Sequence, residues 1–207
     1  KERALAMIRS VGIARPEKVF SEVPAQLSGG MRQRIMIAMA LICRPRLLIC
    51  DEPTTALDVT VQAQILGLIR RLQKETGTSV IFVSHDMGVI SQMADRVAVM
   101  YAGQLVEYAE GEKIFTEPKH PYTQGLQAAI PRLDEEKDTL LSIPGNVPML
   151  YDLPKGCIFS PRCAHATEQC RNERPELVEN SGHLVRCFLY EDNKKQTESQ
   201  SKGGAQA

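Results

Sequence analysis

The sequence predicts an α/β protein with a parallel β-sheet core, followed by a small loop-rich C-terminal extension. Two short, continuous apolar runs, LLIC at 47–50 and VIFV at 80–83, are typical of strands buried on both faces of a parallel sheet. Helix-forming residues occupy 60–74 between them. The order strand, helix, strand is that of a right-handed βαβ unit. From Pro118 onward prolines recur and helical periodicity fades, which marks the extension.

Two helices and a hairpin complete the expected first domain. Apolar residues at helical spacing predict a helix over about residues 4–11, which begins without a capping residue ahead of it. A second helix is expected to open after Ser28-Gly29-Gly30 and to end at about Ile42, because the residue before Pro45 avoids the helical region. Residues 96–109 alternate in polarity around a central turn and predict a hairpin.

These patterns divide the chain into three parts. We expect a first domain over 1–116, the extension over 117–190, and a tail over 191–207. The tail has no aromatic or aliphatic side chain larger than alanine, so burial cannot offset its ordering entropy and we expect it to be disordered.

Composition excludes several classes of protein. Lys plus Arg and Asp plus Glu are both 25, so the net charge is zero, which disfavours binding to nucleic acid or anionic lipid. No apolar run approaches the roughly 18 residues of a membrane span, and the first residues do not resemble a signal peptide. We therefore expect a soluble, cytoplasmic protein. In such a reducing compartment, the crowding of Cys157, Cys163, Cys170 and Cys187 favours metal ligation over disulfides.

Polar residues follow both predicted strands, at the edge where ligands bind in open parallel sheets. Asp51 and Glu52 follow the first strand, and His85 follows the second. Adjacent residues point in opposite directions, so Asp51 can face a Mg²⁺ shell while Glu52 faces a water. Glu52 is thus a candidate general base or water-orienting group, and His85 a candidate donor to a terminal phosphate. The simpler alternative is a solvated acidic pair beside a structural histidine.

A Ser-Gly-Gly turn opens the second helix. Ser28 can cap that helix while the amides of Gly29 and Gly30 face an anion at its positive end. Without other motifs, such a turn is most often only a turn. The lysine-bearing phosphate loop G-x-x-x-x-G-K-[ST] does not occur in the sequence. The chain therefore holds only part of a nucleotide site.

Three segments together resemble the ATP-binding subunit of ABC transporters. They are LSGGMRQR at 27–34, LLICDEPTTALD at 47–58 and VSHD at 83–86, which correspond in order and spacing to the signature motif, the Walker B strand with its D-loop, and the switch histidine. The resemblance covers residues 1 to about 115 and implies the core of a P-loop NTPase whose N-terminal part is missing.

The resemblance also implies a role for each matching residue. Ser28, Gly29, Gly30 and Gln33 would contact the γ-phosphate of ATP held by a partner subunit. In contrast, Asp51, Glu52 and His85 would act with Mg²⁺ on the nucleotide of their own subunit, and Asp58 would bridge the interface between the two subunits.

The extension resembles that of oligopeptide/dipeptide-type importers, in the segments EPKHPYTQGLQAAIP at 117–131 and GCIFSPRCAHATEQC at 156–170. In such relatives four cysteines can carry a [4Fe–4S] cluster. Zinc accepts the same four thiolates, and unligated thiols are a third possibility. His120 and the three residues after it have two interpretations of equal weight, a functional segment of the extension and a simple turn into a helix.

The resemblance implies an ABC-type ATPase that energises import of peptides. Its partners would be a second ATPase subunit, alike or different, membrane permeases and, indirectly, an extracytoplasmic solute-binding protein, with no nucleic acid. It would lie peripherally on the cytoplasmic face of the cell membrane. The family's P-loop, adenine-stacking aromatic and Q-loop should precede residue 1, so this chain alone should be inactive. The alternatives are a soluble ABC-type ATPase outside transport, and a metal-binding regulatory module with vestigial nucleotide motifs.

Overall fold

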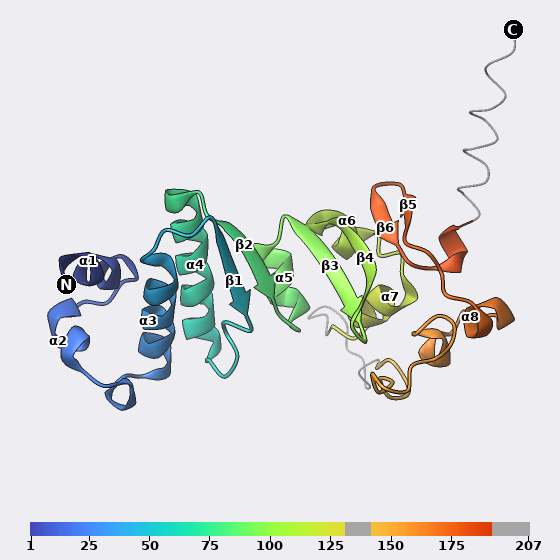
Figure 1. Cartoon of the computed structure of the whole chain (residues 1–207), viewed down its shortest axis with the longest axis horizontal. Helices are drawn as coiled ribbons and strands as arrows, with labels where there is room; N and C mark the ends of the chain where they lie inside the picture. The colour runs from blue at the N-terminus through green and yellow to red at the C-terminus, as the bar shows by residue number, and fades with distance from the viewer. Residues whose placement is uncertain (131–141, 192–207) are drawn as a thin grey trace, which may run out of the picture. The chain divides into compact units, whose positions relative to one another are not determined.

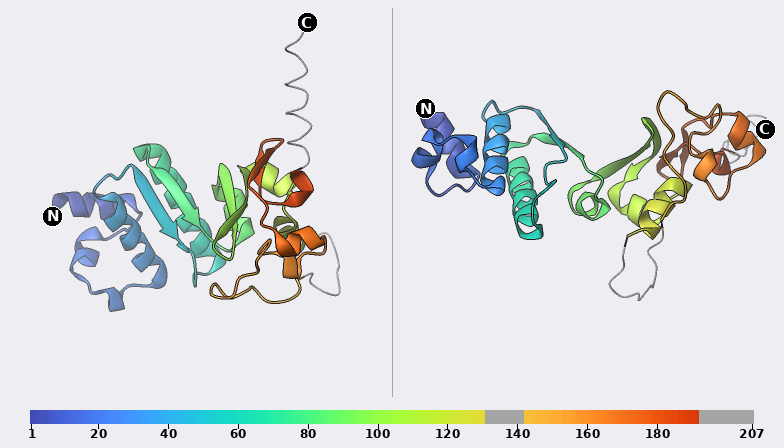
Figure 2. Two further views of the ribbon diagram at one scale, coloured as in Figure 1. Left: turned by 45° about the vertical axis from the view of Figure 1, so that its right-hand side comes forward. Right: turned by 90° about the horizontal axis from the view of Figure 1, so that it is seen from below.

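The computed structural model describes residues 1–130 and 142–191. The chain folds as two units, Lys1–Met93 and a second that begins at Ala94. Figure 1 labels the helices and strands, and Figure 2 gives two further views. Because each unit has its own β-sheet, the two are described separately.

The first unit is the predicted α/β core. Its elements are, in order, α1 (Glu2–Ser10), α2 (Pro16–Ser21), the 3₁₀ helix η1 (Pro24–Gln26), α3 (Gly29–Leu41), β1 (Leu47–Asp51), α4 (Val59–Thr76), β2 (Ser79–Val83) and α5 (Met87–Met93). β1 and β2 pair in parallel, with Ile49 opposite Ile81, and α4 connects them. The predicted strand–helix–strand unit is confirmed.

Local signals fix the ends of the helix that connects the strands. Asp58 caps α4 by accepting a hydrogen bond from the amide of Val61 at 2.9 Å. At the other end Gly77 adopts a left-handed conformation with φ of 67°, which glycine reaches without steric cost. α3 ends at Leu41, close to the predicted stop.

One face of the β1–β2 sheet is covered and the other is exposed. Cys50 on the covered face packs in the core with Ile37 and Leu41 of α3 and with Ile65 and Ile69 of α4. Figures 1 and 2 draw α3 and α4 side by side next to these strands. The opposite face carries apolar side chains that are 46–64% exposed, namely Leu47, Ile49, Ile81 and Val83. The expectation that both faces are buried is therefore met on one face only.

The second unit is built on an antiparallel sheet. Its elements are β3 (Arg96–Tyr101), β4 (Gln104–Glu110), α6 (Gly111–Thr116), α7 (Pro121–Ala128), η2 (Ser160–Arg162), α8 (Glu168–Asn172), β5 (Val178–Asn180), β6 (His183–Val185) and η3 (Phe188–Tyr190). The four strands pair in the order β3-β4-β6-β5. β3 and β4 form the predicted hairpin, whose turn residues Ala102 and Gly103 have φ of 44° and 78°.

The pairing of β4 with β6 joins distant parts of the sequence. Tyr108 lies opposite Leu184, so the hairpin and the C-terminal strands share one sheet. The units consequently divide at Met93, ahead of the hairpin. The domain boundary after residue 116 remains a prediction about sequence modules.

A fully buried carboxylate ties this unit together. Glu107 on β4 is 0% exposed, and its Oε1 lies 2.8 Å from Nδ1 of the equally buried His183 on β6. The same carboxylate accepts the backbone amides of Lys119 and His120, at 2.8 and 2.9 Å. Buried polar groups are costly unless they are paired, and these bonds pair the carboxylate. The two amide bonds also hold the backbone in place just before α7 begins.

No helix in residues 1–130 or 142–191 is long and apolar enough to cross a membrane. Except for Glu191, the predicted tail over 191–207 lies outside the described residues.

Candidate functional site

The Ser-Gly-Gly turn has the geometry that the sequence predicts. Ser28 caps α3 by accepting a hydrogen bond from the amide of Met31 at 3.3 Å. The first amides of a helix have no partner within it, so those of Gly29 and Gly30 are free to bind an anion at the positive end of α3. Ser28 and Gly29 are exposed and Gln33 is half-buried. An anion from outside can therefore reach the turn.

This turn packs against the start of α4. A Cβ atom on Gly30 would lie 2.9 Å from Cγ1 of Val61, and one on Gly29 would lie 3.8 Å from Cδ2 of Leu57. A side chain at position 30 would therefore require Val61 to shift, independently of any ligand. The contact also places Asp58, between Leu57 and Val61, near the turn. Asp58 is exposed and serves as a helix cap, and its bridging role between subunits stays a prediction.

The two acidic residues lie where β1 ends. Asp51 is the last residue of β1, opposite Val83, and its side chain is exposed. The amide of Glu52 donates to the carbonyl of Val83 at 2.9 Å, and Glu52 has a φ of 47°. A non-glycine residue in this left-handed region is strained, and such strain collects at functional sites. Glu52 thereby leaves the strand direction that Asp51 follows.

Glu52 and His85 meet directly. Nδ1 of His85 lies 2.7 Å from Oε1 of Glu52, and the backbone amide of His85 donates to the same oxygen at 3.1 Å. Both side chains are open to solvent, with exposed fractions of 36% for Glu52 and 80% for His85. The sequence-based expectation that these residues gather at one edge of the sheet holds for this pair.

The pairing changes the proton affinity of both groups. Hydrogen bonds from His85 and then Thr55 lower the pKa of Glu52 below its ordinary value of 4.5. The hydrogen bond to Glu52, with its negative charge, raises the pKa of His85 above 6.5. The arrangement therefore favours an ionised Glu52 beside a protonated His85. An ionised carboxylate can orient a water, and an imidazolium can donate to a phosphate oxygen.

Thr55 is a contact that sequence reasoning missed. Its hydroxyl donates to Oε2 of Glu52 at 2.9 Å, so both oxygens of the carboxylate have partners. Thr55 lies in the turn that links β1 to α4. The only sequence signal was that this threonine follows the acid by three residues, ahead of the expected helix.

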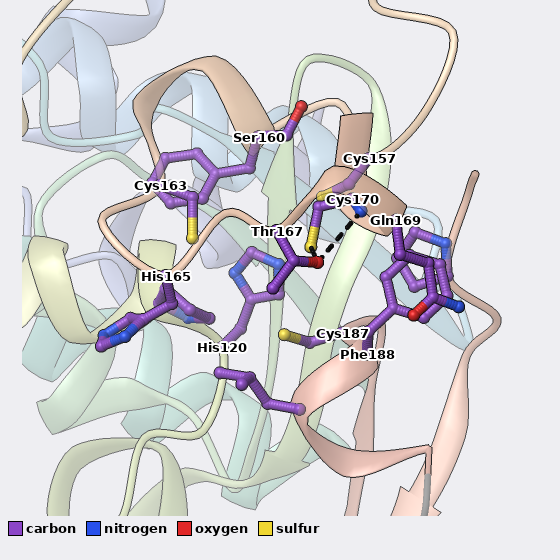
Figure 3. A pocket seen from close by; sticks show the side chains of 14 residues that line it. His120, Cys157, Ser160, Cys163, His165, Thr167, Gln169, Cys170, Cys187 and Phe188 are labelled. Carbon is purple, nitrogen blue, oxygen red and sulfur yellow. Dashed lines mark hydrogen bonds between the residues drawn. The ribbon is translucent and has the colours of Figure 1, made fainter. Parts of the chain in front are cut away.

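The second unit contains a cavity of about 300 Å³ lined by all four predicted cysteines. Figure 3 shows Cys157, Cys163, Cys170 and Cys187 around this space, together with His120 and His165. The thiols come from separate segments. The amide of Cys157 donates to the carbonyl of Cys170 at 2.8 Å, and Cys187 directly precedes η3. Crowding in the sequence thus corresponds to proximity in space.

These side chains are not arranged as a metal site. All four cysteines are free thiols. Burial raises the pKa of Cys157 and Cys163, and it raises that of Cys187 to about 12. Metals bind the thiolate, and burial disfavours the thiolate. Ligation would therefore require the metal's charge to offset the cost of deprotonating these buried thiols. Among the described residues, no group of three or more His, Cys, Asp or Glu side chains could hold a metal ion. The donor types suit zinc or a [4Fe–4S] cluster, and the geometry does not.

The histidine of the His-Pro-Tyr-Thr segment lines the same cavity. His120 is 2% exposed, and its Nδ1 accepts the amide of Tyr122 at 3.1 Å as the cap of α7. Burial lowers the pKa of His120 to about 4, so its ring is neutral at physiological pH. The interpretation as a helix entry is correct, and the cavity contact goes beyond it. Sequence reasoning missed the contact between Glu107 and His183, because that contact depends on the pairing of β4 with β6.

Two family models match the chain. The model described as "ABC transporter" matches residues 1–55, which include the turn and the acidic pair. The model described as "Oligopeptide/dipeptide transporter, C-terminal region" matches residues 106–170, which include three of the four cysteines.

Curated relatives cover most of this chain. It is 52% identical over 193 residues to the oligopeptide transport ATP-binding protein AppD of Bacillus subtilis, which covers 93% of this chain and 59% of AppD. It is 51% identical over 187 residues to the dipeptide transport ATP-binding protein DppD of Haemophilus influenzae, which covers 90% of this chain and 57% of DppD. The chain therefore spans less than two thirds of the length of these relatives.

A solved structure has a similar fold. The protein cbiO1 from Clostridium perfringens, described as part of the ABC transporter complex cbiONQ, superposes with a TM-score of 0.51 and 30% sequence identity. The match covers 56% of this chain and 45% of cbiO1.

Proposed function

We propose that this chain belongs to the ABC transporter ATP-binding family, in its oligopeptide/dipeptide group, and that it supplies part of an ATP-hydrolysing subunit that energises peptide import. The observation that carries the catalytic part is the direct contact of Glu52 with His85, at the end of β1 and β2. Import of peptides is supported by the match of the second unit to the oligopeptide/dipeptide model.

Hydrolysis needs an attacking water held in line with the terminal phosphate. Glu52 is the group suited to hold it, because its carboxylate is ionised and reachable from solvent. A lowered pKa makes Glu52 a weak base, which favours orienting the water over removing its proton early. His85 would donate to a phosphate oxygen as negative charge develops there.

Magnesium and ATP are the cofactors that the family implies. Asp51 fits Mg²⁺, since it is an exposed carboxylate at a strand end and Mg²⁺ prefers oxygen ligands. When bound, Mg²⁺ would neutralise charge on the phosphates. Asp51 would hold that ion from its position at the end of β1, so Glu52 would not be needed as a ligand and could act on the water.

The Ser28 turn would serve a second subunit. We infer that its free amides contact the γ-phosphate of ATP bound by the partner, which would make the working form a dimer. In this dimer Asp58, next to the turn, would lie at the interface. The P-loop that carries ATP is absent from this sequence, so the chain alone should not turn over ATP.

A chimera tests the catalytic proposal. The part of AppD that this chain does not match is joined to the chain, and ATP hydrolysis is measured for the wild type and for Glu52→Gln. We expect Glu52→Gln to lower kcat by about 10²-fold or more. Glu2→Gln, at an exposed carboxylate on α1, is the matched control and should retain activity. Unchanged turnover in Glu52→Gln rejects the catalytic role of Glu52.

The membrane-bound part of the proposal has a separate test. We propose that the subunit docks on permeases at the cytoplasmic face of the membrane, and that a solute-binding protein delivers the peptide. The tagged chimera should co-purify from membranes with permease subunits. The competing proposal, an ATPase outside transport that acts on nucleic acid, instead requires salt-dependent nucleic-acid binding. The zero net charge favours the transporter.

The cysteine cavity carries a finer proposal, that its four thiols ligate one metal centre. The family resemblance and the shared cavity support it, and the present side-chain arrangement does not. Metal analysis and visible absorption of anaerobically purified protein would distinguish iron–sulfur, zinc and no metal. Cys187→Ser should abolish binding, whereas Cys43→Ser, at an exposed thiol of the first unit, should not. Metal-free wild-type protein would exclude the centre.

A further inference from the structure

The carboxylate of Glu52 is held from two sides that differ in kind. Oε1 receives two contacts from His85, which follows the neighbouring strand β2. Oε2 receives the hydroxyl of Thr55, which belongs to the same turn as Glu52 itself. One contact therefore crosses between chain segments, whereas the other is local.

The second contact matters because of how a glutamate side chain rotates. The last torsion of glutamate, between Cγ and the carboxylate, is broad and has no sharp minimum. Contacts to Oε1 alone leave the other oxygen of the carboxylate unconstrained. A partner on each oxygen fixes its plane. Thr55 thus supplies the constraint that the His85 contact alone lacks.

The hydroxyl is not needed to close the turn. The amide of Thr55 donates to the carbonyl of Glu52 at 3.3 Å, and that of Leu57 donates to the carbonyl of Thr54 at 3.2 Å. These backbone bonds hold the turn without any side chain. Thr55 is also exposed, so its methyl group adds little to the core. The hydroxyl's contact with Glu52 is therefore separable from folding.

We propose that Thr55 is a positioning residue for Glu52, which keeps the carboxylate oriented while His85 changes partner. This role rests on the proposed function. If Nδ1 of His85 turns from Glu52 to donate to a phosphate oxygen, Oε1 of Glu52 loses the imidazole, keeps the backbone amide of His85 and gains room for a water. Throughout that exchange Thr55 keeps its bond to Oε2, since it moves with the same turn.

Titration of the isolated chain tests the contact without requiring catalysis. The side-chain carboxyl of Glu52 is followed by ¹³C NMR as the pH changes. In Thr55→Val the carboxylate loses a hydrogen-bond donor, and its midpoint should shift upward. Thr55→Ser retains the hydroxyl and should restore the wild-type midpoint. Thr60→Val, at an exposed threonine in the first turn of α4, is the matched control and should leave the midpoint unchanged.

Kinetics of the chimera with AppD tests the positioning role. Thr55→Val should lower kcat about fivefold with KM for ATP unchanged, as expected when one net hydrogen bond is lost only from the reacting arrangement. Thr55→Ser should recover most of this loss.

The outcomes separate the two proposals. An unmoved Glu52 midpoint, or an unchanged kcat in Thr55→Val, overturns the role of Thr55 while leaving that of Glu52 intact. Unchanged turnover in Glu52→Gln overturns the proposed function, and the positioning role falls with it even where the midpoint moves.

Discussion

At the scale of single residues, the pair of Glu52 and His85 has a defined pH window. The pKa of Glu52 is lowered, so its contribution to stability is complete above pH 4.5 and is lost as the pH falls through the lowered pKa. The pKa of His85 is raised, so its contribution is complete below pH 6.5 and is lost as the pH rises through the raised pKa. The charged pair is therefore complete between these limits. Both side chains are exposed, so the pair affects local charge more than overall stability.

The window leads to a reciprocal prediction. In Glu52→Gln the imidazole loses its carboxylate partner, so the pKa of His85 should fall toward its ordinary value. The imidazole signals of His85 in an NMR titration measure this change. Glu75→Gln, at an exposed glutamate on α4, should leave the pKa of His85 where it is. Equal titration of His85 in wild type and Glu52→Gln would show that the contact does not persist in solution.

Replacing Glu107 should cost more free energy of unfolding than replacing an exposed carboxylate, because Glu107 is fully buried. Glu107→Gln replaces one acceptor oxygen by a donor amide, so a backbone amide of Lys119 or His120, or the ring of His183, loses its partner. We expect a loss of about 2–4 kcal/mol in the free energy of unfolding. Urea denaturation of the isolated chain measures it. Glu110→Gln, at an exposed position on the same strand, should change stability by less than about 0.5 kcal/mol. Equal effects at the two positions would contradict the structural role of Glu107.

At the scale of elements, the start of α3 packs closely against the start of α4 because Gly30 has no side chain. In Gly30→Ala the added Cβ would meet Cγ1 of Val61 at 2.9 Å, so either the Val61 side chain or the two helix starts must shift. We expect a cost of about 1–3 kcal/mol in the free energy of unfolding. Gly29→Ala, with its nearest contact at 3.8 Å, is the control and should cost less.

A second substitution identifies the cause. Val61→Ala removes the methyl group that a Cβ on Gly30 would contact, so the double variant should recover part of the stability lost in Gly30→Ala. If Val61→Ala gives no recovery, the cost comes from elsewhere, and the packing explanation for Gly30 is wrong.

Elements that depend on local sequence were predictable. The apolar runs gave β1 and β2, Ser28 gave the start of α3, and the alternation around Ala102 gave the β3–β4 hairpin. The proximity of Glu52 to His85 was also predictable, because neighbouring parallel strands end at the same edge.

Pairings between distant segments were not predictable. The partner of β4 is β6, whose three residues are too short to produce a clear alternating pattern. The burial of Glu107 follows from that pairing. In the sequence alone Glu107 is only a charged residue in a predicted strand, and nothing nearby indicates that it is buried. For the cysteines, the sequence located the cluster, but a common cavity does not determine ligation geometry.

At the scale of the whole molecule, the first unit carries the residues proposed for ATP chemistry, and the second carries the cysteine cavity and the oligopeptide/dipeptide match. One face of the β1–β2 sheet exposes apolar side chains, which indicates a surface of the first unit that favours being covered. Parallel sheets are normally covered on both faces, because each strand carries apolar side chains on both sides. The chain spans 59% of AppD, so relatives have additional chain that can supply such a cover.

This face gives the last prediction. Leu47, Ile49, Ile81 and Val83 form one apolar surface on adjacent strands, so the isolated chain should bind a hydrophobic dye such as ANS and self-associate as its concentration rises. The paired substitutions Ile49→Thr and Ile81→Thr keep β-branched side chains in both strands and should reduce dye binding and association. In the chimera with AppD the wild-type face should become covered, so the dye signal should fall without any substitution. A chimera that binds as much dye as the isolated chain would mean that the added segment does not pack on this face, and that completing the nucleotide site requires a different arrangement of the two parts.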